Sequence, residues 1–145
     1  MLGGTFADDL LKLIFHGTPI PNVAANAIAS PLSSLYASLH TANPGVAGSQ
    51  SANELNYSGY ARVAVGRNSI SWIVDSGVAR PSGRISFGAM TDGLEVSAGW
   101  FAIGTAASGA GKILVRGRIT PEIECRVGVE PALKSDTRIV FVNGA

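Results

Sequence analysis

Two stretches of the sequence decide the fold, LYASLHTANPG at residues 35–45 and YSGYARVAV at residues 57–65. In the first stretch Leu35, Ala37 and Leu39 alternate with more polar side chains, which is the period of a half-buried strand. The Pro-Gly pair at its end favours a turn, because proline presets φ and glycine tolerates positive φ. The last five residues of the second stretch alternate in the same way. The two stretches therefore predict two strands joined by a turn-rich loop.

The composition agrees with a β-rich domain. The chain has 145 residues, which is enough to bury a core without disulfides. Hydrophobic residues make up 46%, charged residues only 14%, and there are 18 glycines. Low charge with many small residues suits an all-β protein with tight turns. It suits equally a protein whose surface is partly covered by neighbouring molecules.

The charge pattern, the cysteine count and the N-terminal segment argue against nucleic acid binding, an internal disulfide, a metal site and a membrane span. The net charge is +1 and the basic residues are scattered, so we expect no nucleic acid partner. A single cysteine forms no internal disulfide, and no cluster with metal-ligand spacing is present in the sequence. The N-terminal apolar run is too short to span a bilayer and has no basic residues before it. We therefore expect no membrane partner and a protein that is kept in a cytoplasm until it assembles.

Residues 5–16 predict the one clear helix, with a threonine as N-cap and a glycine after its end. Phe6, Leu10, Leu13 and Ile14 fall on one face of this helix. Such an apolar stripe must be buried, either against the sheet of its own subunit or against a neighbouring subunit.

A proline-bearing segment follows the helix. Pro19 and Pro21 forbid regular helix and central strand, so residues 17–34 are expected to form an extended arm. The expected division of the chain is an N-terminal helix and arm at residues 1–34 and a β-sandwich domain at residues 35–145.

From residue 35 onward, short apolar segments alternate with turn residues. Eight such segments without long helical patterns between them predict an antiparallel β-sandwich of jelly-roll type with the one N-terminal helix. The expected strands are residues 35–40, 60–66, 69–74, 84–88, 94–103, 112–119, 123–129 and 137–142. A loop at residues 120–122 would join two of them as a hairpin and turn Cys125 into the core.

Candidate chemical sites are weak. The glycine-rich run at residues 104–112 resembles a phosphate-binding loop, but it has Ala106 and Ile113 where that pattern needs glycine and a hydroxyl residue. His16 is expected to interact with the helix C-terminus, and His40 is expected at a strand end on the polar face. Neither histidine has partners that suggest metal binding or general-base catalysis. We therefore expect no cofactor, no metal and no catalytic residue.

Two further readings of the side chains stay open. Dispersed carboxylates could in principle converge for glycan cleavage, and the candidates are Asp75, Asp92, Glu95, Glu122 and Glu124. Aromatic side chains could form a sugar-binding surface, although burial is favoured because their surroundings are apolar; these are Tyr57, Tyr60, Trp72 and Trp100.

The stretches at residues 35–45 and 57–65 also carry a resemblance. A strand and turn of the form LYxxLxTAxPG, followed after a variable loop by E…GYARVAV, resembles a family of small bacteriophage virion proteins. The similarity extends from about residue 35 to residue 142. Members of the family are described as tail fibre proteins, and some belong to the capsid-decoration, or cement, class. The resemblance implies a virion structural protein, assembled in the host cytoplasm, without enzymatic activity.

Two functions follow as expectations. The first is a capsid-associated cement protein, a homotrimer that binds the major capsid protein and stabilises the shell. The alternative is a tail fibre or tail-tip protein that recognises a host surface glycan. In either case the residues expected to contact a neighbouring subunit or the shell are those of the helix stripe and the arm, namely Phe6, Leu10, Leu13, Ile14, Pro19 and Pro21.

Overall fold

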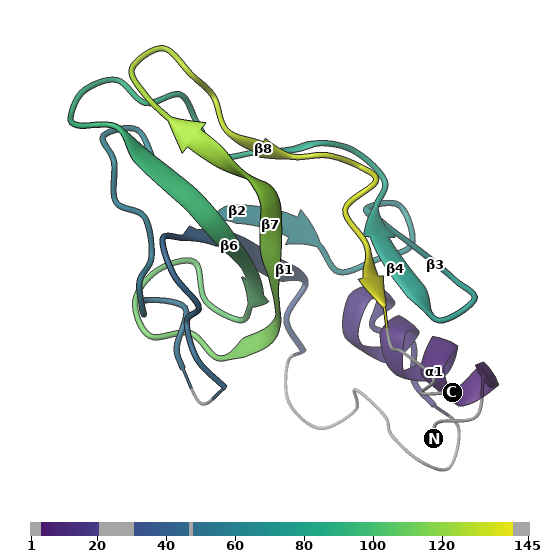
Figure 1. Ribbon diagram of the computed structural model, residues 1–145. Coiled ribbons are helices and arrows are strands. Elements are labelled where there is room, and N and C mark those ends of the chain that lie inside the picture. Colours follow the sequence, from purple (N-terminus) through teal and green to yellow (C-terminus); the bar gives the residue numbers. More distant parts are fainter. Residues whose placement is uncertain (1–3, 21–30, 47, 141–145) are drawn as a thin grey trace. The chain divides into compact units, whose positions relative to one another are not determined.

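The computed structural model describes residues 4–20, 31–46 and 48–140, and Figure 1 shows strands joined by loops, with a helical segment near the start of the chain. The sheets are antiparallel, so the predicted all-β class with one short N-terminal helix is confirmed. The elements are α1 (Gly4–Leu11), the π-helical turn η1 (Lys12–His16), β1 (Ser34–His40), β2 (Val63–Gly66), β3 (Trp72–Asp75), β4 (Val78–Pro81), β5 (Ile85–Ser86), β6 (Val96–Gly104), β7 (Ile113–Cys125), β8 (Ala132–Leu133) and β9 (Ile139–Val140).

The chain divides into two compact units. Unit 1 comprises residues 1–34, 66–84 and 134–145, and unit 2 comprises residues 35–65 and 85–133. The helix therefore groups with two later segments of the chain as well as with the arm. The division predicted from the sequence, at residues 34 and 35, stays a prediction.

Unit 1 contains a three-stranded sheet in the order β3-β4-β9. Trp72 lies opposite Pro81 and Asp75 lies opposite Val78, so β3 and β4 form a tight hairpin. The turn residues Ser76 and Gly77 both have positive φ, which is the geometry that matches the twist of the paired strands. Strand β4 was not among the predicted strands.

The helical segment packs against its own subunit. Ala7, Leu11 and Phe15 are fully buried, and the Phe15 ring lies 4.5 Å from the Trp72 ring. The buried face is thus offset from the predicted stripe. The offset is already present in α1, where Ala7 and Leu11 are the buried residues.

The end of the helical segment is held by an arginine. Arg67 donates from Nε to the Ile14 carbonyl at 2.6 Å and from Nη2 to the Leu13 carbonyl. It therefore satisfies carbonyls that the last turn leaves without partners. His16 lies in the last turn, and its Nε2 lies 3.0 Å from the Trp72 carbonyl; its predicted interaction with the helix C-terminus stays a prediction.

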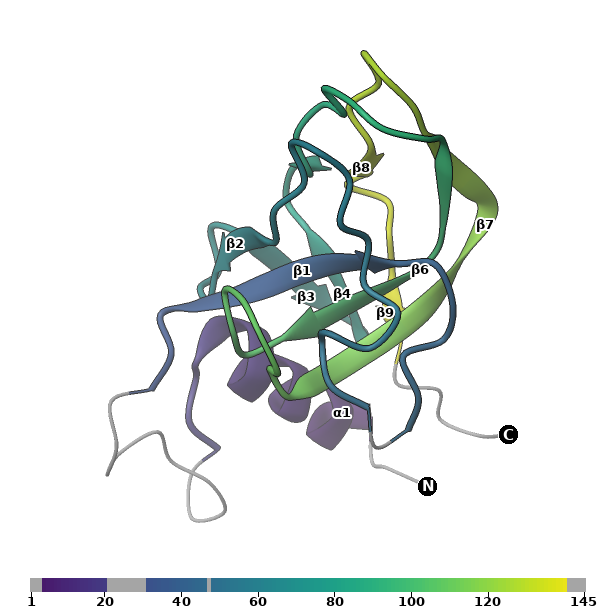
Figure 2. The ribbon, with the colours of Figure 1, turned by 90° about the vertical axis from the view of Figure 1, so that its left-hand side faces the viewer.

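Unit 2 is built on a four-stranded sheet in the order β2-β1-β6-β7, with β5 and β8 forming a separate two-stranded sheet. Figure 2 shows β1, β6 and β7 side by side. The alternation at the start of β1 predicted its buried face correctly, because Leu35, Ala37 and Leu39 are all buried. Phe101 faces Gly117 across the sheet, and a side chain at Gly117 would meet the Phe101 ring at 2.5 Å.

Strand β7 corrects the predicted hairpin at residues 113–129. It runs without a turn from Ile113 to Cys125 and pairs with β6 along its length. The pairing shifts where Ala98 faces Ile123 and Trp100 faces Arg118, so residues 119–122 protrude from the ladder. Pro121 is tolerated there because β7 is the last strand of the sheet order. Cys125 is fully buried, as expected.

The remaining predicted strands are shorter in the structure. Residues 60–66, 69–74 and 84–88 contain β2, most of β3 and β5, and residues 94–103 correspond to β6. The last predicted strand, 137–142, contains β9, while its final two residues lie outside the described residues.

Candidate interaction surfaces

The motif that carries the family resemblance forms a buried ion pair. Arg62 donates from Nε to Glu54 Oε1 and from Nη2 to Glu54 Oε2, both at 2.7 Å. The two side chains are 2% and 16% exposed. Arg62 also donates to the carbonyls of Ala106 and Gly109, at 3.0 and 2.7 Å. The Glu54 carboxylate raises the pKa of Arg62 further above its ordinary value. This arginine therefore ties the segment after β1 to the glycine-rich loop after β6.

The two tyrosines of the stretch at residues 57–65 point inward. The Tyr60 hydroxyl donates to Glu54 Oε1 at 3.0 Å and accepts a hydrogen bond from the Leu39 amide, also at 3.0 Å. The Tyr57 hydroxyl lies 2.9 Å from the Gly88 carbonyl. Burial raises the pKa of Tyr60 far above its usual range and that of Tyr57 to about 12. Both residues therefore hold the interior of unit 2 together.

The glycine-rich loop at residues 104–112 is explained by a buried glutamine. Gln50 donates from Nε2 to the Tyr36 carbonyl at 3.1 Å, and its Oε1 accepts from the Ala106 amide at 3.0 Å. A side chain at Gly104 would lie 2.1 Å from Gln50 Cδ, and one at Gly111 would lie 2.2 Å from Gln50 Oε1. These glycines make room for a side chain of the protein itself.

His40 contradicts its predicted place on the polar face. It is fully buried, with Nε2 lying 2.9 Å from Ser38 Oγ and Nδ1 lying 2.9 Å from the Ala52 carbonyl. The loop that follows β1 folds back over this side of the strand and covers it, as the hydrogen bond between the Leu55 amide and the Leu39 carbonyl shows. Burial lowers the pKa of His40 below 6.5. The serine and histidine lie side by side, but neither is accessible to a substrate.

A pocket of about 360 Å³ opens on unit 2 between the segment at residues 54–58 and the loop at residues 90–96. Its apolar lining includes Leu55, Met90 and Val96, and Asp92 lies at its rim. Leu94, which also lines the pocket, is 92% exposed. An exposed leucine beside an apolar-lined hollow is typical of an interaction site. From the sequence, this loop offered only Asp92 and Glu95 as dispersed carboxylates and an Asp-Gly turn followed by a leucine.

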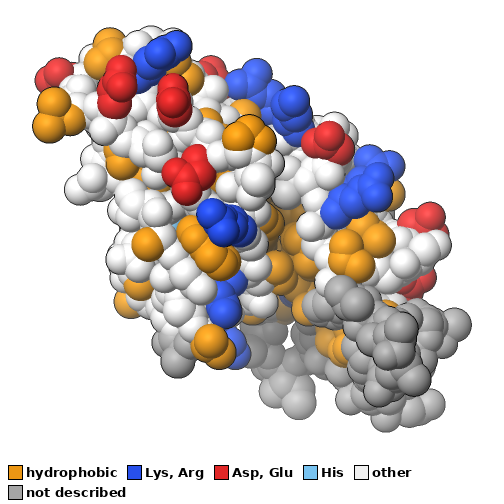
Figure 3. Space-filling view, viewed as in Figure 1, with side chains coloured by type: hydrophobic (Ala, Val, Ile, Leu, Met, Phe, Trp, Pro, Cys, Tyr) orange, Lys and Arg blue, Asp and Glu red, His pale blue; other side chains and the backbone are white. Residues whose placement is uncertain are grey.

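Charges are unevenly distributed over unit 2. Figure 3 shows acidic side chains gathered at the upper left and a column of Lys and Arg side chains below them on the same face. In the sequence of unit 2, exposed acids are found at 92, 95, 122, 124 and 130, whereas basic residues occupy 62, 112, 116, 118 and 126. The five acids considered for glycan cleavage do not all belong together, because Asp75 is part of unit 1.

The predicted contact residues of the N-terminal segment are placed as follows. Leu10, Leu13 and Ile14 are half-buried, and Pro19 is exposed. The side chain of Phe6 and the whole of Pro21 lie outside the described residues. The packing of Ala7, Leu11 and Phe15 on unit 1 thus leaves part of the predicted stripe accessible, and its role in subunit or shell contact stays a prediction.

Within residues 4–20, 31–46 and 48–140, no group of three His, Cys, Asp or Glu side chains is placed to hold a metal ion. In the same ranges no helix is long and apolar enough to cross a membrane.

The fold and these surfaces define an all-β protein whose motif residues are engaged in internal contacts and whose accessible features are suited to contacts with other macromolecules. Residues 7–135 match the family model described as Podophage GP4 fiber I protein gp80. The chain belongs to this family, and it is therefore a phage structural protein. No curated protein matches the sequence.

Proposed function

We propose that the protein is a structural subunit of a phage fibre and that it acts by binding other proteins of the particle. The family match over residues 7–135 carries this proposal. The structure supports it because the ionisable groups of the motif, Glu54 and Arg62, are paired with each other inside unit 2. A fibre subunit needs stable units with accessible contact surfaces, and it needs no catalytic group.

A second candidate is the capsid-decoration protein that the sequence favoured. Its support is the low fraction of charged residues, 14%, which suits a protein partly covered by neighbours such as the major capsid protein. The family description is that of a fibre protein, so the fibre role now ranks first.

Copy number separates the two candidates. Purified virions would be digested and the protein quantified by mass spectrometry against the major capsid protein. A fibre subunit is expected at a small fraction of the capsid protein, whereas a decoration protein is expected near equal stoichiometry. Immunogold labelling of intact particles would provide a second measurement, with label at the tail for the fibre role. Near-equal stoichiometry with label over the shell would overturn the fibre proposal.

We propose further that the accessible side of the N-terminal helix attaches the protein to a neighbour in the particle. Leu10, Leu13 and Ile14 remain half-buried after the helix has packed on unit 1, so they are available for a second contact. The variant Leu10→Ser/Ile14→Ser should fold like the parent and fail to enter particles. A control at Ala7, a buried position, should impair folding instead. Normal incorporation of the double variant would rule out this attachment.

Recognition of a host glycan remains a prediction attached to the fibre role. The aromatic side chains that could have formed a sugar-binding surface are mostly internal, since Tyr57 and Trp72 are 8% and 1% exposed. Binding of the labelled purified protein to host cells, with and without periodate oxidation of their surface sugars, would test it.

A further inference from the structure

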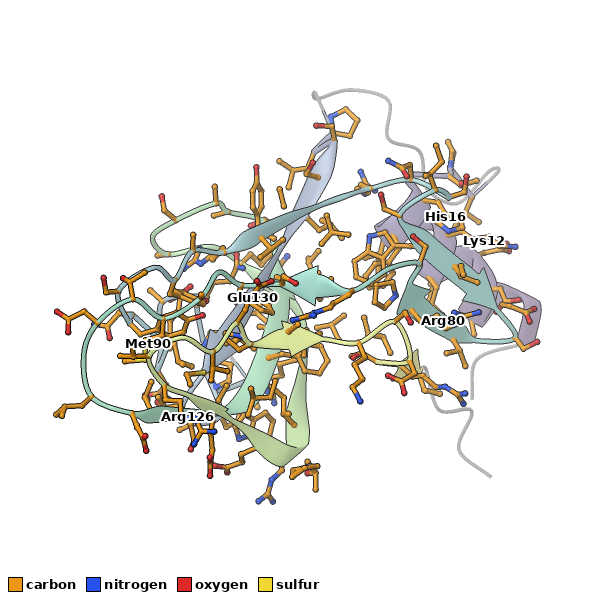
Figure 4. The ribbon with its side chains drawn as sticks, turned by 90° about the horizontal axis from the view of Figure 1, so that it is seen from above. Lys12, His16, Arg80, Met90, Arg126 and Glu130 are labelled. Carbon is orange, nitrogen blue, oxygen red and sulfur yellow. The ribbon has the colours of Figure 1, made fainter. Side chains whose placement is uncertain are left out.

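One end of unit 2 combines acidic groups with exposed apolar side chains. At this end β6 begins at Val96, opposite Cys125 near the end of β7. Met90 pairs with Val127 there, and Figure 4 shows Met90 and Arg126 in the same region. Leu94 is 92% exposed and Val127 is 60% exposed. The acidic end, as we call it, is defined by the exposed residues Asp92, Glu95, Glu122 and Glu124, with Arg126 as a basic residue among them.

The other end of the same ribbon is basic. Lys112, Arg116 and Arg118 form the basic segment, which covers the start of β7. Lys112 and Arg118 are exposed, and Arg116 is held in place by a hydrogen bond of 3.0 Å from its Nε to Asn43 Oδ1. Leu114, between these cations, is 36% exposed at a position where β7 has one residue more than β6.

The outer parts of the two regions lie far apart within one unit. Gly104 of β6 faces Ile113 at the basic segment, and Val96 faces Cys125 at the acidic end. These positions are eight residues apart along β6, which corresponds to about 26 Å at a rise of ~3.3 Å per residue. Lys112 precedes Ile113 and Glu95 precedes Val96, and opposite charges that far apart are largely screened from each other at physiological salt. Arg118 is closer to the acidic end, since it faces Trp100, three residues from Ser97, the partner of Glu124. The outer charges at the two ends are therefore available to another molecule.

We propose that the acidic end of one copy binds the basic segment of a second copy, head to tail, with Leu114 of one copy entering the pocket beside Leu94 of the next. Both halves of the contact have an apolar centre and charges around it, which is the usual anatomy of a binding hot spot. The acidic end of one copy attracts the basic segment of the next, whereas two acidic ends repel each other. A head-to-tail contact of this kind closes into a ring or extends as a filament. Either product suits a fibre subunit, and the inference rests on that proposed function.

Charge reversal provides a test in which each variant controls the other. The first variant, Glu95→Lys/Glu124→Lys, reverses the acidic end, and the second, Lys112→Glu/Arg118→Glu, reverses the basic segment. All four side chains are exposed, so both variants should fold. Asp92, which accepts a hydrogen bond from the Gly93 amide, and Arg116 are left unchanged. A control, Lys134→Glu/Asp136→Lys, reverses two exposed charges of unit 1 and leaves the net charge unchanged.

The readout is the oligomeric state of the full chain at micromolar concentration, measured by sedimentation velocity. The measurement is made at about 50 mM and about 500 mM salt, because the screening of charges differs strongly between these conditions. The parent and the control should associate, and the higher salt should weaken association by at least about tenfold. Each reversed variant alone should be monomeric. An equimolar mixture of the two should associate again, because each then offers the charge that the other needs.

A second variant tests the apolar centre without any change of charge. Leu94→Ser removes a side chain that is 92% exposed, so folding should be unaffected while association weakens. A parent that stays monomeric at low salt would overturn the proposal. So would a mixture that stays monomeric although circular dichroism shows both variants folded. These results are independent of copy number in the particle, so the fibre role can fail or hold separately.

Discussion

Replacement of Arg62 by alanine should be the most damaging single change in unit 2. The change would leave the Glu54 carboxylate, which is 16% exposed, without its two hydrogen bonds of 2.7 Å. The carbonyls of Ala106 and Gly109 would lose their donor as well. Removal of one partner from a buried ion pair costs about 3–5 kcal/mol. The carbonyls can recover part of their hydrogen bonding from water, so we expect a total of about 3–5 kcal/mol.

The free energy of unfolding is measured by urea titration, as the product of the midpoint and the slope. Each unit contains one tryptophan, Trp72 in unit 1 and Trp100 in unit 2, so fluorescence of a Trp72→Phe background reports on unit 2 alone. A domain is stable by only about 5–15 kcal/mol, so Arg62→Ala should shift the midpoint strongly or abolish folding.

Two companion variants separate charge from geometry. Arg62→Lys keeps a positive charge but loses the planar fork that matches the carboxylate, and we expect a loss of about 1–2 kcal/mol. The double variant Glu54→Leu/Arg62→Met leaves no charge without a partner, so it should be more stable than Arg62→Ala. A loss below about 1 kcal/mol for Arg62→Ala would refute the reasoning, because it would show that water solvates Glu54 easily.

Three further changes have definite expected outcomes. The pKa of His40 is lowered, so the unfolded state binds a proton first as the pH falls below 6.5, and the free energy of unfolding then decreases by up to about 1.4 kcal/mol per pH unit. Thermal melting of His40→Gln between neutral and mildly acidic pH should show a shallower loss of stability. Gly104→Ala should destabilise unit 2 by about 1–3 kcal/mol, because its new methyl group would lie 2.1 Å from Cδ of the buried Gln50. The control Gly83→Ala, with open space around it, should be nearly neutral in the same urea titration. Phe15→Ala should cost about 3–5 kcal/mol and shift the emission of Trp72 to longer wavelength as its ring becomes hydrated; unchanged emission would show that the helix does not cover it.

The sequence predicted those parts of the fold in which one local rule determines the structure. The alternation at Leu35, Ala37 and Leu39 predicted the buried face of β1, and the apolar surroundings of Trp72 predicted its burial. Cys125 was expected in the core, and it is there. In each case the side chain and its near neighbours in the sequence contain the necessary information.

The errors arise where distant segments decide the structure. Strand β4 was missed because the reversal of the chain at Ser76 and Gly77 becomes evident only from the pairing of β3 with β4. Strand β7 was divided in two because Pro121 normally ends a strand, and its place at the sheet margin was not known. His40 was placed at the surface because nothing near it in the sequence shows that residues 49–55 cover it.

The candidate surfaces were the least predictable part. The motif that identifies the family is largely internal, so its recognition pointed to the family and not to the residues that contact other molecules. The acidic end brings together the 92–95 and 122–124 segments, which are far apart in the chain. Their proximity follows from the pairing of β6 with β7 and could not be read from composition.

The protruding residues of β7 have a consequence for the behaviour of the protein at high concentration. The outermost strand of a sheet offers unpaired amides and carbonyls on which another chain can stack, and this is a common route to insoluble aggregates. In β7 that template is interrupted near its middle, since residues 119–122 leave the ladder and Pro121 has no amide hydrogen to donate. At high concentration, copies can therefore lie side by side without their backbones joining at this part of the strand.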